Sequence, residues 1–589
     1  MTCKNWNASW PLSSNGWGIN QELNIDMSSY TNAGTLKAIS ETKGMVYQGV
    51  EFSDATGTYP TLSGLKTTMF ANVTTGSKIK NLNVTINTSN LTVTSGDDYG
   101  TFISKSFGDL SNVNFVNNTI TNCKFGTSKS SLTNFGVIGY NGGDLTDVKF
   151  IKPHWDGNTI YATNIGLMPI LDEAGGSVTT STGLYVEGDT DPNNAMLSNN
   201  TLVGTNVGIV GFGNKSKLTN TTIKNINWAS NTIVADYSGF FGLFTGTSNG
   251  LTIDSISWKN LNVFYKSIDA MQGITSNTSS SFGIIPIVGY SAAFTNTTIS
   301  NVDILNLNSK VGTAGIVGNV YSNITNLGIS NVHIYNDTTT KNTITGQSFG
   351  MIASIYAGTV DGVTVSKPVD KNYGFAMENL KLYTSYWGVV GYNQATIKNS
   401  AFNDILISGV DSTKAVTTVT SSNEFAYGAF GKNLGSITDF DLNRVQVVNN
   451  IFTESTSSDP IYVGIFGYNA VGTINNTGKT TRVIDTITID KNTVKTSSTT
   501  LQKYGFIGRN SANETGTANV SDLAITNYTS GGYGFVYQND TANITNVTLG
   551  SKAVPAVIAK PFFAAVNNGA ITRCSMEALS SKEKRYEDQ

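Results

Sequence analysis

The sequence predicts an all-β protein, and more specifically a right-handed parallel β-helix of about thirteen coils with an N-terminal cap. Three observations lead to this prediction. The composition is rich in glycine and poor in charge, a short glycine-containing apolar motif recurs along the chain, and alternating apolar residues follow most copies of the motif.

The composition favours stacked β-structure over several ordinary domains. The 589 residues include 60 Gly and only 10 Pro, and 13% of them are charged, whereas ordinary domains carry about 25% charged residues. The hydrophobic content of 39% is too high for a disordered chain. Leu- and Ala-rich stretches with helical periodicity are absent from the sequence, so the prediction is all-β.

The repeated motif is clearest in the stretch SYWGVVGYNQATIKNSAFNDILI, residues 385–407. Taken alone, a Gly-x-x-Gly spacing fits a loop that holds a phosphate, but such a loop precedes a helix, and none is predicted here. The motif also recurs thirteen times, at gaps of 29 to 44 residues. Its leading glycines are residues 100, 136, 166, 208, 239, 283, 315, 350, 388, 428, 464, 505 and 534.

Each repeat contains a short apolar run and then residues that alternate between apolar and polar, a pattern typical of strands. One repeat cannot bury a core by itself, but stacked coils can. We expect the glycines to allow close backbone approach or a positive φ at corners. These structural glycines are Gly136, Gly208, Gly283, Gly315, Gly388, Gly391, Gly428, Gly464 and Gly505.

Two further columns are expected just after the glycine motif. Asparagines suit a left-handed corner and a ladder of stacked amides; they are Asn141, Asn393, Asn433, Asn469 and Asn510. Aromatic residues one position earlier are expected to stack as a column; they are Tyr140, Phe212, Tyr290, Tyr392 and Tyr468.

The predicted organisation has three parts. Residues 1–60, with Trp6, Trp10 and Trp17, are expected to cap the first coil, because an open solenoid end must be covered. Residues 61–575 form the repeat domain. Residues 576–589 concentrate charge and are expected to be a tail.

The copies of Gly-apolar-apolar-Gly, each followed by strands of the form Ile/Val-x-Asn-apolar, resemble GLUG-type repeats. Such repeats occur in large β-helical surface proteins of bacteria, including adhesins and haemagglutinin-like passengers. The resemblance covers roughly residues 60–575. It implies an extracellular or cell-surface recognition role, and it carries no catalytic residues to this chain.

Several classes of function are disfavoured by the sequence. A net charge of −3 without a basic stripe disfavours nucleic-acid binding. Three dispersed cysteines and two histidines disfavour cysteine or histidine catalysis and zinc binding. The longest apolar stretch, residues 553–566, is too short to span a membrane, and the N-terminus shows no apolar leader.

The first candidate binding site is the insertion at residues 150–164, where His154, Trp155 and Asp156 are adjacent. A tryptophan beside an acid and an imidazole can stack on a sugar and hydrogen-bond to it.

The second candidate is the insertion at residues 171–196, which concentrates acidic side chains in a chain poor in charge. Its acids are Asp172, Glu173, Glu187, Asp189 and Asp191. They suit a calcium site or a pair of glycosidase carboxylates, although a solvated loop is the simpler reading. No other cofactor or metal is expected, and no column of acids at matching repeat positions is evident.

We therefore expect a non-enzymatic surface or fibre protein that binds glycans or cells and that forms a homo-oligomer or filament. One alternative is a spike or fibre on a virus surface that cleaves glycans at the acidic insertion. Another is a structural subunit of a sheath, filament or virion.

Overall fold

A computed structural model describes residues 18–21, 23–28, 45–49, 59–172, 179–191, 193–265, 280–337, 342–413, 424–454, 460–476, 482–495, 500–512 and 516–580. Every regular element in these ranges is a β-strand, and the strands belong to two sheets of 32 and 29 strands. The all-β, solenoid-like prediction is therefore confirmed. The predicted cap tryptophans and most of the charged tail lie outside the described ranges.

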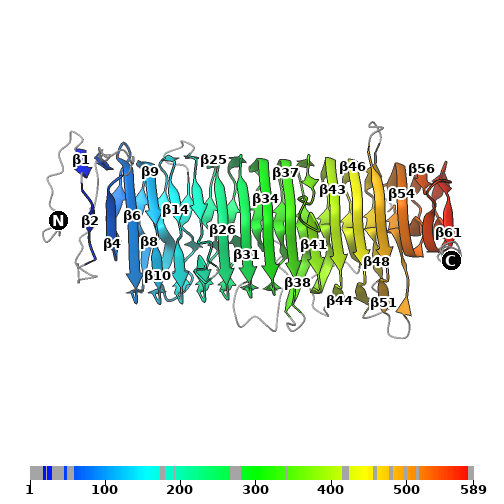
Figure 1. The fold of residues 1–589 in the computed structure, drawn as a ribbon, viewed down its shortest axis with the longest axis horizontal. Coiled ribbons are helices and arrows are strands. Elements are labelled where there is room, and N and C mark those ends of the chain that lie inside the picture. The colour runs from blue at the N-terminus through cyan, green and yellow to red at the C-terminus, as the bar shows by residue number, and fades with distance from the viewer. Residues whose placement is uncertain are drawn as a thin grey trace. The chain divides into compact units, whose positions relative to one another are not determined.

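The chain divides into two compact units. Unit 1 contains residues 1–268 and 285–298, and unit 2 contains residues 269–284 and 299–589. Within each unit the strands lie side by side, and each strand pairs with the equivalent strand of the next repeat (Figure 1).

Strands of the two sheets alternate along the chain. Long strands of the 32-stranded sheet are β6 (Lys78–Ser89), β9 (Asp109–Val116), β26 (Thr222–Ala229) and β31 (Thr252–Lys259) in unit 1, and β37 (Asn323–Tyr335), β43 (Thr396–Ser408), β46 (Ser436–Val448) and β54 (Asn519–Tyr533) in unit 2. Those of the 29-stranded sheet are β8 (Gly96–Ser106) and β12 (Leu132–Asn141) in unit 1, and β36 (Thr313–Val320), β38 (Thr343–Ile355), β42 (Lys381–Asn393), β45 (Phe425–Asn433), β48 (Ile461–Ala470) and β53 (Tyr504–Ser511) in unit 2.

The pairing is parallel throughout these strands. One short pair is antiparallel, β51 (Thr493–Lys495) with β52 (Thr500–Leu501). Parallel pairing between equivalent repeats requires the chain to return to the same edge once per repeat, which is the geometry of a solenoid.

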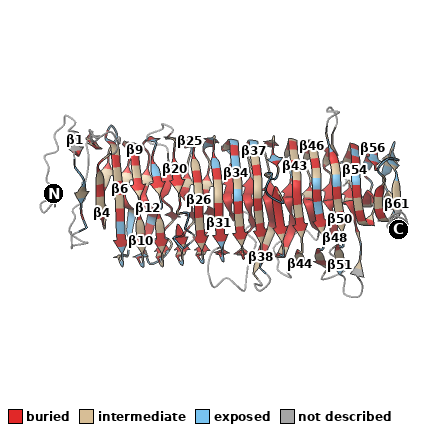
Figure 2. Ribbon diagram, viewed as in Figure 1, coloured by how far each residue is buried: buried red, intermediate tan, exposed pale blue. Residues whose placement is uncertain are grey.

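The two sheets bury their residues differently. In β42 every residue of the glycine motif is buried. In β43 buried residues alternate with partly exposed ones (Figure 2). The continuous apolar runs and the alternating runs of the sequence therefore occupy different sheets. The alternating strands present one face to the core and the other outward.

The glycines of the motif are in register and touch the next coil. Gly350 pairs with Gly388, and Gly428 with Gly464. A Cβ placed at Gly388 would lie 2.5 Å from the Gly428 carbonyl oxygen and 2.6 Å from that of Ala429. Close approach, rather than a positive φ, explains why glycine is needed at Gly388.

The prediction for the motif asparagines is half confirmed. Asn393, Asn433, Asn469 and Asn510 form an amide ladder with Nδ2–Oδ1 distances of 2.8, 2.8 and 2.9 Å. None of them, nor Asn141, has a positive φ, so the left-handed-corner prediction is wrong.

Most of the non-glycine residues with a left-handed backbone have polar side chains, and in several of the alternating strands they recur every fifth residue. Asn296, Asn301 and Asn306 have φ values of 52°, 53° and 55°. Asn399 and Asp404, with φ of 51° and 57°, repeat the spacing. Asparagine tolerates this conformation better than other non-glycine residues, which explains much of the chain's asparagine content.

The predicted aromatic column is interrupted. Along the register, Ser354, Tyr392, Lys432, Tyr468 and Arg509 occupy successive rungs. In unit 1, Phe212 lies between Ile170 and Leu243. Tyr290 follows the end of β33 (Ser281–Val288) and is 78% exposed, so it is no part of a column.

The motif also bends the strand sharply. The rings of Tyr386 and Tyr392 lie 5.2 Å apart, as do those of Tyr462 and Tyr468 at 5.1 Å. Six residues of straight strand would separate them by about 20 Å. The segment between them, which holds Gly388 and Gly391 in β42, must therefore turn so that the flanking tyrosine side chains meet, and they meet as a buried cluster.

Cations complete this buried tyrosine cluster, and we expect Arg509 to be the member whose replacement costs most stability. Its guanidinium lies 5.0 Å from the Tyr462 ring and 5.1 Å from the Tyr468 ring, and it donates to Asp540 at 3.0 Å and to Glu424 at 3.3 Å. Replacing Arg509 with Met leaves both carboxylates without this cation. Urea unfolding should show a loss of about 2 kcal/mol or more.

The double variant Arg509→Met/Asp540→Asn should recover part of that loss, because it neutralises the carboxylate that Arg509 Nε holds at 3.0 Å, whereas Glu424 keeps its ion pair with Lys432 at 2.9 Å. A double variant less stable than Arg509→Met alone would show that packing, not charge, holds the cluster.

Candidate functional site

The first predicted site does not assemble as a sugar-binding surface. His154, Trp155 and Asp156 form β15 (His154–Asp156), so alternate side chains point to opposite faces. Trp155 is 2% exposed and its ring meets Phe135 edge-on at 5.4 Å, which places it in the core. An indole in this position has no free face for a sugar.

Its two neighbours are held by local hydrogen bonds. The Nδ1 atom of His154 lies 2.7 Å from the Ala195 carbonyl oxygen, a contact that requires the proton on Nδ1. The Asp156 carboxylate accepts hydrogen bonds from Ser198 Oγ at 2.6 Å and Asn199 Nδ2 at 3.0 Å. These contacts join neighbouring coils.

In the acidic insertion, Asp172 and Glu187 have separate partners. Asp172 accepts from Asn214 Nδ2 at 2.8 Å. Glu187 accepts from the Tyr185 hydroxyl at 2.7 Å and pairs with Lys224 at 3.2 Å. Glu173 lies outside the described residues.

Asp189 and Asp191 shape their own turn. The Asp189 carboxylate accepts the backbone N–H of Asp191 at 3.1 Å and pairs with Lys152 at 3.4 Å. The Asp191 N–H, with Asn194 and Lys152, lowers the pKa of Asp189. A depressed pKa suits a turn-forming carboxylate rather than a proton donor.

Metal ligation has no assembled site in the part of the chain that the structure describes. No group of three or more His, Cys, Asp or Glu side chains there is placed to hold an ion.

A convergent set of polar side chains lies elsewhere, on the outward face of the 32-stranded sheet in unit 2. We call it the His333 cluster; it consists of Asp303, His333, Tyr335, Tyr373 and Glu378. The residues come from β34 (Ala293–Leu305), β37, the segment at residues 366–374 and β41 (Phe375–Glu378).

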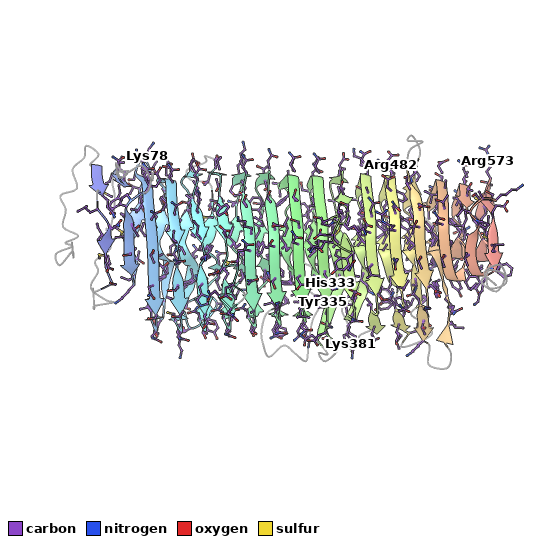
Figure 3. All side chains as sticks on the ribbon, in the orientation of Figure 1. Lys78, His333, Tyr335, Lys381, Arg482 and Arg573 are labelled. Atoms are coloured by element: carbon purple, nitrogen blue, oxygen red, sulfur yellow. The ribbon has the colours of Figure 1, made fainter. Side chains whose placement is uncertain are left out.

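Strand alternation explains why His333 and Tyr335 share a face. Val332 and Ile334 are buried in the core, so the side chains between and after them point outward. Figure 3 shows His333 and Tyr335 next to each other. Their rings stack with centroids 4.0 Å apart and planes inclined by 11°.

The second tyrosine and the carboxylates complete the cluster. The Tyr373 ring approaches the imidazole at 5.0 Å. The Tyr335 hydroxyl donates to the Asp303 carboxylate at 3.3 Å. The His333 Nε2 and Glu378 Oε2 atoms lie 2.8 Å apart. Two aromatic rings, one imidazole and two carboxyl groups thus meet at one place.

The His333–Glu378 contact is short but poorly aligned. At 2.8 Å the atoms are within hydrogen-bonding distance, yet Nε2 has no partner in hydrogen-bond geometry, so the carboxyl group approaches away from the N–H direction. Catalytic hydrogen bonds are often misaligned before a ligand is bound.

Burial shifts both groups toward their neutral forms. It lowers the pKa of His333 to about 4 and raises the pKa of Glu378. Removing a charged group from water penalises the charged form, which explains both directions. Burial, followed by the charges of Glu378 and Asp303, raises the pKa of Tyr373 to about 12, so its hydroxyl stays a donor.

The cluster remains reachable from solvent. The His333 side chain is 18% exposed and that of Glu378 is 30% exposed. Perturbed titrating groups beside aromatic rings at a partly open surface are typical of functional sites. The arrangement can stack on an apolar ring face, donate and accept hydrogen bonds, and exchange a proton.

Sequence reasoning missed this cluster, although a signal was present. Asp303, His333 and Glu378 lie at outward positions near the ends of alternating strands in three successive repeats. Repeat lengths vary between 29 and 44 residues, so their alignment is not visible without the register.

Among the described residues, no helix has the length and apolarity needed to cross a membrane.

No protein-family model matches the chain, and no curated protein matches it.

Proposed function

We propose that residues 61–575 form a right-handed parallel β-helix of about thirteen coils, with a cap at residues 1–60, and that the chain is a GLUG-type surface protein. The in-register glycines and the parallel pairing support this proposal. An extracellular or cell-surface location follows from the same resemblance and is part of the proposal.

The function that the geometry supports best is the binding of a glycan, with the His333 cluster as the site. The observation that supports this proposal most directly is that the partly exposed Tyr335 and Tyr373 lie beside two carboxyl groups and an imidazole. Glycan recognition needs this combination, because sugars present apolar ring faces for stacking and hydroxyls for hydrogen bonds. The acidic insertion offers no comparable set.

Binding of the full chain to an array of neutral, amino and acidic oligosaccharides tests the proposal. Replacing Tyr373 with Ala should weaken the retained glycan about tenfold, because it removes one aromatic contact. Isothermal titration calorimetry measures the change.

Tyr290→Ala is the matched control, since it removes an exposed tyrosine in unit 1. Equal affinity of the Tyr373→Ala and wild-type chains, or the absence of binding to every oligosaccharide, would contradict the proposal.

A further inference from the structure

The bend at the glycine motif holds different side chains in different coils of unit 2. Two columns of side chains meet there, one from the position two residues before the leading glycine and one from the position four residues after it. In the coil of Gly388 these positions hold Tyr386 and Tyr392, whose rings lie 5.2 Å apart and which are 2% and 9% exposed. A pair of tyrosines is thus large enough to occupy the bend.

The two preceding coils carry small polar residues at the same two positions. In the register, Tyr386 and Tyr392 of β42 follow residues of β38, and these follow residues of β36. We call the four small residues the Asn319 group; they are Thr313 and Asn319 of β36 and Ser348 and Ser354 of β38. Their side chains are much smaller than a pair of tyrosine rings, so they do not occupy the same volume.

Two further tyrosines close the bend over the Asn319 group. The Tyr356 hydroxyl donates to Gln347 Oε1 at 3.2 Å, which joins the segments before and after the glycine motif of β38. The Tyr321 ring stacks on the Tyr356 ring with centroids 5.1 Å apart and planes inclined by 14°. Asn319 is 0% exposed and Ser348 is 1% exposed, so bulk solvent does not reach their polar atoms.

The Asn319 amide is buried without hydrogen bonds to protein. Neither its Nδ2 nor its Oδ1 atom has a partner among the described residues, and the same holds for the Ser348 hydroxyl oxygen. Thr313 of the same group, by contrast, donates to the Ser281 hydroxyl at 2.9 Å. Buried polar groups that have lost their bonds to bulk water nearly always find another partner, either protein or an ordered water.

We propose that the Asn319 group binds at least one ordered water molecule inside the bend, held by the Asn319 amide and the Ser348 hydroxyl. A buried water typically makes about three hydrogen bonds to polar groups that have no other partner. The amide supplies one donating and one accepting atom, and the hydroxyl supplies a third bond of either sense. The bend is then filled by tyrosine rings in the coil of Gly388 and by water in the coils before it.

The chemistry of the group favours water over an ion. Its four side chains are an amide and three hydroxyls, none of which carries a charge. A buried ion without an opposite charge beside it is strongly disfavoured, whereas a small neutral molecule that both donates and accepts is not. The inference is independent of the His333 cluster and of glycan binding.

A crystal structure of the full chain, at a resolution that shows interior water, tests the proposal directly. We expect density for a water molecule within about 2.7–3.2 Å of Asn319 Nδ2 and within hydrogen-bonding distance of Ser348 Oγ. Absence of this density in a map that shows other buried waters would overturn the proposal. An Asn319 amide bonded to another protein group would overturn it as well.

Replacing Asn319 with Leu tests in solution whether the amide holds the water. Leucine is close to asparagine in size but forms no hydrogen bonds. If the amide binds water, the replacement breaks those bonds and strands the Ser348 hydroxyl, so the urea midpoint of unfolding should fall. The double variant Asn319→Leu/Ser348→Ala should then recover part of the fall, because it removes the stranded hydroxyl.

An unchanged or higher midpoint in Asn319→Leu would contradict the proposal, because removing an amide that binds nothing relieves an unpaired polar group. Asn433→Leu is the matched control. Its amide bonds to Asn393 and Asn469 within the ladder, so its midpoint should fall whether or not the bend holds water. Far-UV circular dichroism confirms that each variant is folded before its midpoint is compared.

Discussion

Replacing Gly388 with Val should destabilise unit 2 by about 3 kcal/mol or more in urea unfolding. A Cβ at Gly388 would lie 2.5 Å from one backbone oxygen of the next coil and 2.6 Å from another. Backbone atoms cannot rotate away as a side chain can, so the new side chain must push two paired strands apart. The branched Val side chain then adds two methyl groups at the same place.

Three Gly→Ala variants test whether the loss of stability follows the space available for a Cβ atom at each glycine. At Gly505 a Cβ would meet its nearest backbone oxygen at 3.2 Å, and at Gly96 its nearest neighbour is a flexible leucine methyl group at 3.5 Å. We expect Gly388→Ala to be the least stable, Gly505→Ala to be intermediate, and Gly96→Ala to lie within about 0.5 kcal/mol of the wild type. An order that does not follow these distances would contradict the explanation by close approach.

Acidification should destabilise the wild-type fold through His333. Its pKa is about 4 in the folded chain and about 6.5 when unfolded. Between these values the unfolded chain binds the proton and the folded chain does not, so stability falls as the pH falls from about 6.5 toward 4. The loss from this group between pH 8 and pH 5 is about 2 kcal/mol.

Glu378 acts in the opposite direction. Its raised pKa means that the folded chain holds this proton more firmly than the unfolded chain, which adds stability at low pH that is lost as the pH rises through its folded pKa. The loss of stability caused by His333 should therefore be clearest at pH values above those at which the carboxyl groups titrate.

Urea unfolding at pH 8, 6.5, 5.5 and 5 measures the dependence for wild type, His333→Gln and His154→Gln. Because the chain has only two histidines, these variants isolate each in turn. The His333→Gln chain should show a shallower slope of unfolding free energy with pH than the wild type. If the unfolding free energy of all three chains changed equally with pH, the result would contradict a desolvated His333 imidazole.

The repeat itself was readable from the sequence. The Gly-x-x-Gly motif places Gly350, Gly388 and their equivalents in register, and the continuous apolar runs are buried as expected. The amide ladder through Asn393 and Asn433 also followed from its position after the motif. These features repeat, and a repeated residue in stacked coils must meet its own copy.

The sequence did not show which side chains of the insertions point into the core and which point outward. Trp155 follows Lys152, which adopts a left-handed φ of 51° that shifts the alternation of the strand. The indole therefore enters the core, although the neighbouring polar residues suggested an exposed loop. A single left-handed residue exchanges the two faces of a strand.

By itself the sequence determined an all-β chain of parallel repeats, the burial of its continuous apolar runs and the glycines at its closest contacts, because these depend on local pattern and repetition. Only the tertiary structure decided that Asp303, His333 and Glu378 meet and that the acids of residues 171–196 do not. The physical reason is that repeats of unequal length are aligned by backbone pairing between coils, and this pairing selects which outward side chains become neighbours.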